Sequence, residues 1–106
     1  MSLQRLGGFD LAATTTTLLY ECPANFQAMA CVNIVARSSA TTFRLALTAS
    51  STPADTDWLE YDLDLSQNVA VYRSGIAMAA GNRLYGYAGA TGVSVVLFGN
   101  AERLNL

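Results

Sequence analysis

Residues 27–37 alternate strictly between two sets of side chains, and this period of two constrains the fold more than any other feature. Successive side chains of a β-strand point to opposite faces, whereas the period of a helix is about 3.6 residues. One set is uniformly apolar and should face a core. It consists of Ala28, Ala30, Val32, Ile34 and Ala36. The stretch therefore predicts a β-strand that is buried on one side.

Further runs rich in Thr, Val, Leu, Tyr and Phe follow along the chain, with turn residues at intervals of about 8–12 positions. The inward-facing side chains expected in these runs are Phe43, Leu45 and Leu47, then Leu59, Tyr61, Leu63 and Leu65, and finally Val93, Val95 and Leu97. Gly75 should break or bulge the strand over residues 69–79, because glycine weakens the interior of a strand.

These features predict an all-β chain, namely a single antiparallel β-sandwich (jelly-roll or Ig-like) of about seven to eight short strands. At 106 residues the chain has the length of one domain. Residues 1–13 contain few periodic apolar positions, so we expect an N-terminal arm there and the sandwich domain over residues 14–106. Such an arm is suited to adding to the sheet edge of a neighbouring subunit.

The composition is unusually poor in charge. Apolar residues make up 52% of the chain and charged residues only 13%, about half of the roughly 25% that is typical of soluble domains. Either the surface is unusually neutral or other subunits cover part of it. We expect the second alternative, and therefore a homo-oligomer.

Several function classes lack the residues that they need. The chain has no histidine and no lysine, which are the commonest general base and the Schiff-base nucleophile, so we expect neither an enzyme nor a cofactor. The six arginines are scattered, which argues against nucleic acid as a partner. No apolar stretch reaches the roughly 18 residues of a membrane span, and the N-terminal sequence lacks the order of a signal peptide.

One acidic run, between residues 55 and 64, is open to three interpretations. Glu60, Asp62 and Asp64 should share one strand face about 7 Å apart. They could hold a hard cation, although their spacing fits no calcium loop. They could also be a solvated strand face, which is the default expectation, or pair with Arg44 and Arg73 on neighbouring strands.

The aromatic residues and the cysteines are also ambiguous. Trp58 and the tyrosines could be stacking surfaces for sugar rings. The single Trp has no Asn, Asp or Gln cluster beside it that would bind sugar hydroxyls, so packing in a core or interface is expected.

Cys22 and Cys31 have neither zinc-site partners nor the C-x-x-C spacing. With a turn centred on Ala24–Asn25 they lie roughly 13 Å apart, beyond the ~7 Å limit of a disulfide. We expect two reduced thiols, unless the loop runs to Ala30 and permits a bridge.

Five segments follow one another along the chain: LQRLGGFDLAATTTTLLYECPA, ACVNIVARSSATTFRLAL, WLEYDLDL, GIAMAAGNRLYGYAG and VSVVLFG. Their order resembles that of a group of small structural proteins of tailed bacteriophages, and the resemblance covers nearly the whole chain. It implies a virion component, assembled in the host cytoplasm, whose partners are the major capsid protein or neck and tail subunits.

Some proteins of this group decorate the outer capsid surface and tie neighbouring capsomers together, whereas others join tails or fibres to the particle. We therefore expect a capsid decoration (cement) protein. The alternatives are a neck, tail or fibre attachment protein and, from another class, a carbohydrate-binding module. The residues expected in its interfaces are Leu3, Arg5, Leu6, Phe9, Trp58, Glu60, Asp62, Asp64, Tyr72, Tyr85 and Tyr87.

Overall fold

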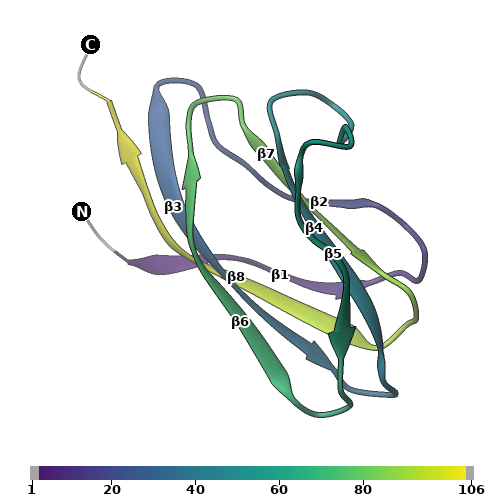
Figure 1. The fold of residues 1–106 in the computed structure, drawn as a ribbon. Coiled ribbons are helices and arrows are strands. Elements are labelled where there is room, and N and C mark those ends of the chain that lie inside the picture. The colour runs from purple at the N-terminus through teal and green to yellow at the C-terminus, as the bar shows by residue number, and fades with distance from the viewer. Residues whose placement is uncertain (1–2, 105–106) are drawn as a thin grey trace.

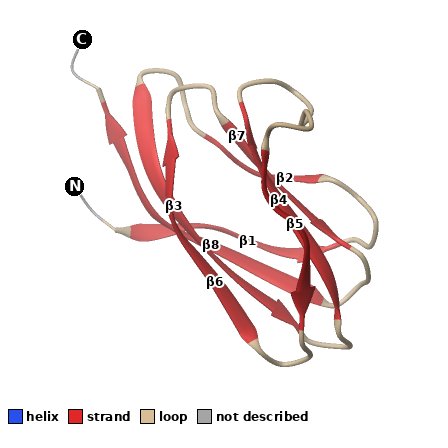
Figure 2. Cartoon of the chain, viewed as in Figure 1, coloured by secondary structure: helices blue, strands red, loops and turns tan. Residues whose placement is uncertain are grey.

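Eight β-strands make up the part of the chain that the computed structural model describes, residues 3–104 (Figure 1). No helix occurs among these residues, and hence none that could cross a membrane (Figure 2). The strands are β1 (Gln4–Leu11), β2 (Thr17–Glu21), β3 (Phe26–Ala36), β4 (Thr41–Thr48), β5 (Trp58–Leu65), β6 (Ala70–Met78), β7 (Arg83–Ala88) and β8 (Val93–Arg103). The all-β fold class is confirmed.

The strands form two antiparallel sheets of four; in Figure 1, β3 and β6 lie on the left, β2, β4, β5 and β7 lie on the right, and β1 and β8 run across the view. Sheet A has the order β1-β8-β3-β6, and sheet B has the order β2-β7-β4-β5. The first half of the chain pairs with the second: β1 with β8, β2 with β7, β3 with β6 and β4 with β5. One long hairpin rolled into a sandwich has this pattern, which is the jelly-roll and not the Ig-like alternative.

The core lies between the sheets and uses the inward positions that the alternation predicts. All five apolar residues of β3, from Ala28 to Ala36, are buried. On β8 the inward residues are fully buried, whereas Val96 and Phe98 point to the opposite side. β8 is apolar on both sides because it lies in the middle of sheet A. The largest fully buried side chains are Phe43, Ile34, Leu45, Leu65, Leu84, Leu97, Val32, Val93 and Val95.

Most of the residues expected in an N-terminal arm belong to the sandwich itself. β1 pairs with β8 of the same chain along its length and forms one edge of sheet A. Phe9 and Leu11 are the cross-strand partners of Val95 and Val93 and pack into the core. The expected boundary at residue 13 therefore does not mark the start of the sandwich. Residues 1 and 2 of the expected arm lie outside the described residues.

β5 departs from the simple alternation expected for residues 58–65. Its register against β4 is irregular at two places between the pairs Trp58–Ala46 and Leu63–Phe43. Five steps along β5 match three steps along β4, so the strand bulges. Tyr61 consequently turns outward and is 58% exposed. The prediction that Tyr61 faces the core is wrong, because a bulge reverses the direction of the side chains that follow it.

Two glycines show where the backbone needs a residue without a side chain. The predicted bulge at Gly75 is confirmed, because the register of β3 against β6 shifts there and φ is +73°. Gly99 has φ +147°, and a Cβ at this position would lie 2.0 Å from the carbonyl oxygen of Met29. The backbones of β3 and β8 therefore approach each other closely in the middle of sheet A.

Both cysteines are free thiols. β3 begins at Phe26, in agreement with the predicted early strand start. However, β2 and β3 belong to different sheets, so the hairpin assumed for the intervening turn is wrong. Cys22 is part of the core, and burial raises the pKa of its thiol. Cys31 is half-buried on the outward side of sheet A.

Candidate docking surface

Face B, the outward side of sheet B, carries an aromatic cluster built around one arginine. The guanidinium carbon of Arg44 lies 4.1 Å from the ring centre of Tyr61 and 4.8 Å from that of Tyr87. Trp58 meets the Tyr61 ring edge to face, with the ring centres 5.4 Å apart. The four side chains come from β4, β5 and β7, which are neighbours in sheet B. We call these four residues the face B cluster.

The register of the strands brings this cluster together. Arg44 and Tyr87 are cross-strand partners, so their side chains emerge next to each other. The bulge of β5 places Tyr61 on the other side of Arg44. The same bulge holds Asp62 at φ +52°, a left-handed conformation that Asp tolerates better than most residues. In this position, the Asp62 carboxylate accepts a 2.6 Å hydrogen bond from Nε of Arg44.

Arg44 is thus held between two aromatic rings and one carboxylate. The hydrogen bond to Asp62 raises the pKa of the Arg44 guanidinium above its usual range, so the side chain stays charged. A guanidinium can stack through its flat faces and form hydrogen bonds through its edge at the same time. Because these contacts already fix the side chains, little further ordering is needed when the cluster meets a partner.

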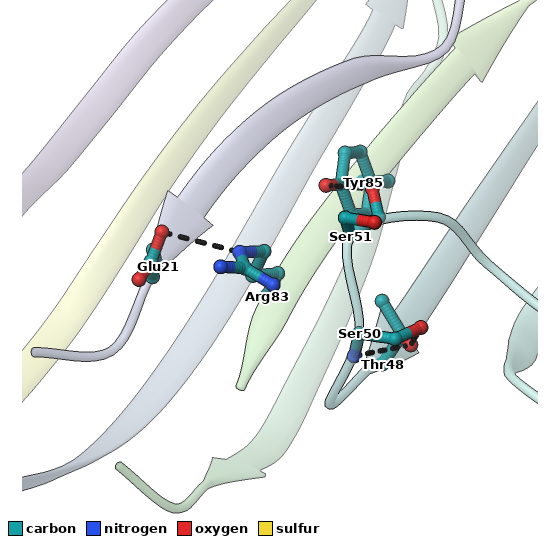
Figure 3. A network of polar contacts seen from close by, with 6 residues as sticks. All are labelled: Glu21, Thr48, Ser50, Ser51, Arg83 and Tyr85. Atoms are coloured by element: carbon teal, nitrogen blue, oxygen red, sulfur yellow. Dashed lines mark hydrogen bonds and ion pairs between the residues drawn. The ribbon is translucent and has the colours of Figure 1, made fainter. Parts of the chain in front are cut away.

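A second group of contacts fixes the border of the cluster at the loop over residues 49–57. The Tyr85 hydroxyl donates a 2.6 Å hydrogen bond to the carbonyl oxygen of Ser51, as Figure 3 shows. Where the loop begins, the backbone N–H of Ser50 donates to the Thr48 hydroxyl at 3.0 Å. The loop is therefore tied to β7 as well as to β4 and β5.

Ala46 shows how well this border is covered. It is the cross-strand partner of both Trp58 and Tyr85 and points away from the core, yet it is fully buried.

On the far side of β7, Nε of Arg83 donates a 3.2 Å hydrogen bond to the Glu21 carboxylate (Figure 3). Face B thus combines aromatic side chains with ion pairs.

The three acidic residues expected on one face of β5 do not share it. Asp62 and Asp64 are exposed on face B, whereas Glu60 is the partner of the inward-facing Leu45. Glu60 therefore points toward sheet A, where its carboxylate accepts a 2.6 Å hydrogen bond from Arg73 of β6. This ion pair joins the sheets along the side where β5 and β6 are the edge strands.

Of the three interpretations of the acidic run, pairing with arginine is the one that the structure shows for Glu60 and Asp62. Within residues 3–104, no group of three or more His, Cys, Asp or Glu side chains is placed to hold a metal ion. An inward-pointing charge such as Arg73 also makes an exposed sheet edge a poor template for pairing with another chain.

Face A, the outward side of sheet A, has a different chemistry. Tyr72 of β6 stacks on Phe98 of β8 across the intervening β3, with the ring centres 5.8 Å apart. Cys31, the cross-strand partner of Phe98, lies on the same side of β3. A hydrogen bond with Cys31, together with burial, raises the pKa of the Tyr72 hydroxyl. The outward residues on the middle of this face are Met29, Cys31, Asn33, Val35, Ala70, Tyr72, Ala77, Ser94, Val96, Phe98 and Asn100.

The remaining expected interface residues lie on β1 or just before it. Leu3 is 83% exposed, and Arg5 extends along β1 over Gly8 at the rim of face A. Leu6 and Phe9 are partly buried and pack against the core. The expected interface residues therefore do not form one surface, because β1 and Tyr72 belong to sheet A and the others to sheet B.

A groove of about 570 Å³ opens at the end of sheet A where β3 begins and where β6 and β8 end. Most of its lining is apolar, with Phe26, Met78 and Leu104 among the larger side chains. Met29 and Ala77 line the groove and also belong to face A, so the groove borders that face.

Two members of the face B cluster were not expected in a site. Arg44 was predicted only as an ion-pair partner, and Tyr61 was predicted to face the core. Their grouping depends on a bulge and on a pairing between distant strands, and neither leaves a local signal in the sequence. No protein-family model, curated protein or solved structure matches this chain.

Proposed function

We propose that this chain is a structural protein of a bacteriophage virion, namely a capsid decoration protein that docks through face B at junctions between capsid subunits. The observation that carries this proposal is the face B cluster of Trp58, Tyr61, Arg44 and Tyr87. Trp, Tyr and Arg are the residues most enriched among those that dominate binding at protein interfaces. The resemblance of the sequence to phage structural proteins and its low content of charge support the same conclusion.

The mechanism is binding without covalent chemistry. Each copy would bridge two neighbouring capsid subunits. The face B cluster would fill a pocket on the capsid surface, and Asp64 would face a positively charged side chain of a capsid subunit at the rim of this contact. Asp64 is exposed and, among the described residues, has no ion-pair partner, so its charge is available to such a contact. Many copies on one shell would add weak contacts into a large stabilisation against heat and internal pressure.

The test is to add the purified chain to particles assembled without it and to count the bound copies. A decoration protein should reach a copy number that matches the capsid lattice and should raise the temperature at which the shell opens. Tyr61→Ala should weaken binding about thirtyfold or more, because truncating an interface hot spot costs about 2 kcal/mol or more. The matched control is Leu18→Ala, which alters an exposed apolar side chain of face B outside the cluster.

The copy number also separates the alternatives. A few copies per particle, at one vertex, would replace the decoration function by a neck or tail function. Complete absence of the chain from purified particles would refute a virion role of any kind.

A carbohydrate-binding module is the second candidate, and the aromatic pair of the half-buried Trp58 and the exposed Tyr61 favours it. Flat aromatic rings on the outer face of a sandwich can stack against sugar rings. On this alternative the free protein should bind glycans on an array and lose that binding on Trp58→Ala. A decoration protein should bind no glycan, and the same substitution should weaken its binding to the shell.

A further inference from the structure

We propose that face A is a self-association surface, which pairs face to face with face A of a second copy of the chain in a two-fold dimer. This inference does not rest on the proposed function, because it concerns the opposite side of the sandwich and the free protein. Four properties of face A carry it: its lack of charge, its regularity, its size and its apolar side chains.

Charge distinguishes face A from the other surfaces of the sandwich. In a two-fold interface, a residue near the axis meets the same residue of the other copy, so a central charge would meet its like. No outward side chain on the middle of face A is charged. The charges lie at its rim and have both signs: Arg5, the ion pair of Asp10 with Arg37, and Glu102. A charge-free middle lets identical surfaces meet, whereas an unlike partner is usually selected by complementary charges.

Regularity of the two central strands gives face A an even middle, whereas the outer strands β1 and β6 each bulge once. β3 and β8 pair over eleven consecutive residues, from Phe26–Arg103 to Ala36–Val93, without a shift of register. The close approach of the backbones at Gly99 keeps this seam tight. A regular ladder presents an even row of side chains, which can lie against an identical row at about 10 Å between sheets.

The size of the face is sufficient for a stable dimer. The strands of sheet A have 8, 11, 11 and 9 residues. With about 3.3 Å per residue along a strand and about 4.8 Å between strands, the footprint is about 600 Å² per copy. Two such footprints bury about 1,200 Å², at the lower end of the range of specific protein–protein interfaces.

Aromatic and sulfur-containing side chains supply the contact energy. Tyr72 is 56% exposed and Met29 is 45% exposed, and Phe98 is stacked under Tyr72. Tyr, Phe and Met are enriched at protein interfaces. The groove beside Met29 adds a concave end to the face. Asn33, the cross-strand partner of both Val96 and Tyr72, is the polar residue at the centre.

The experiment uses charge reversal at Asn33 in the full-length free protein. Sedimentation equilibrium should give a dimer for the unaltered chain. Asn33→Lys and Asn33→Glu should each raise the dissociation constant about a hundredfold or more, because each places like charges opposite one another. An equimolar mixture of the two variants should regain the dimer, and native mass spectrometry should find one copy of each variant in it.

The matched controls are Leu18→Lys and Leu18→Glu, which make the same charge changes on face B and should leave the dimer intact. Circular dichroism verifies that each variant is folded. If the Asn33 variants unfold, Tyr72→Lys and Tyr72→Glu take their place, since that side chain is more than half exposed.

Three results would overturn the proposal: a monomer at all micromolar concentrations, dimers that the charge changes on face A leave unaffected, or folded variants whose mixture stays monomeric. Because no particle is present, these results are independent of the test of shell decoration. A chain that is a monomer and still fills the capsid lattice would refute the dimer and retain the decoration function.

Discussion

Face A and face B cover the same core from opposite sides, and they are built in opposite ways. Face A rests on the regular β3–β8 ladder and has no charge in its middle. Face B includes the bulged strand β5 and carries a charged arginine between two aromatic rings. The comparison teaches that the two outer faces of a sandwich can differ in chemistry, because outward side chains do not have to pack in the shared core. On the two proposals above, the neutral middle of face A meets a like partner and the charged, aromatic face B meets an unlike one.

The largest effect is expected at the seam of face A. Gly99→Ala places a Cβ against the carbonyl oxygen of Met29 at a φ that L residues avoid. The free energy of unfolding should fall by about 3 kcal/mol or more, from strain and overpacking combined. Denaturant unfolding measures this loss.

The matched control is Gly81→Ala, which also lies at positive φ, +83°, but with open space around the added Cβ. There the loss should be about 1 kcal/mol. Equal losses at the two positions would contradict the close approach of the β3 and β8 backbones at Gly99.

A smaller effect is expected at the ion pair that links the two sheets. Arg73→Met should lower the free energy of unfolding by about 1 kcal/mol or less, because both partners are partly exposed. The same change removes an inward charge from the edge strand β6, so it should increase aggregation in concentrated solution. Light scattering measures the second effect. Glu60→Gln removes the other charge of the pair but keeps a polar side chain on the edge strand β5, so it should reproduce the loss of stability with a smaller increase in aggregation.

A smaller change in stability is expected within the face B cluster. Arg44→Lys keeps the positive charge but removes the flat group that stacks between Tyr61 and Tyr87. The melting temperature should change less than on Arg73→Met, whereas the fluorescence of Trp58 should shift as the Tyr61 ring loosens. Arg83→Lys, on the same face but outside the cluster, should leave the emission of Trp58 as it is. A shift of equal size in both variants would contradict a distinct cluster.

The smallest effect is an alkaline loss of stability with separate contributions from the two sheets. Burial raises the folded-state pKa of Cys22 and Tyr20, which lie at β2 of sheet B, and a hydrogen bond with Cys31 raises that of Tyr72 on face A. At low pH the groups are protonated in both states, so their contribution is fully present. As the pH rises through the unfolded values, about 8.5 for the thiol and about 10 for the phenols, the unfolded chain releases protons first and stability falls.

Measuring the free energy of unfolding across this pH range tests the sign of its change with pH and the groups that cause it. Cys22→Ala should reduce the loss of stability that begins near the thiol pKa of the unfolded chain. Tyr72→Phe should reduce only the loss near the phenol pKa. A stability that rises with pH in this range would contradict the direction of all three pKa shifts.

Much of the fold follows from local pattern alone. The period of two in residues 27–37 predicts which side chains enter the core, and the structure buries that set completely. Turn residues predict where the strands stop, and Gly75 bulges as expected. Such features depend only on neighbouring residues, since steric limits on the backbone make adjacent side chains of a strand point in opposite directions.

The candidate site was less predictable for a physical reason. Among the strands of residues 3–104, consecutive ones mostly lie in different sheets, and only β4 and β5 are both adjacent in the chain and paired. The turn after Cys22 therefore crosses from one sheet to the other, where the sequence alone suggests a hairpin. Likewise, the expected role of Tyr61 failed because two bulges change the direction of side chains without altering the composition of the strand.

By itself the sequence determined the class of fold, most of the strands, and the inward set that forms the core, because these depend on periodicity within short segments. The tertiary structure decided which strands pair, and hence that Arg44 meets Tyr87, that Glu60 reaches Arg73, and that face A carries no central charge. Those outcomes depend on register between segments that are distant in the chain. Register is set by the packing of the whole core, so it becomes visible only when both sheets are in place.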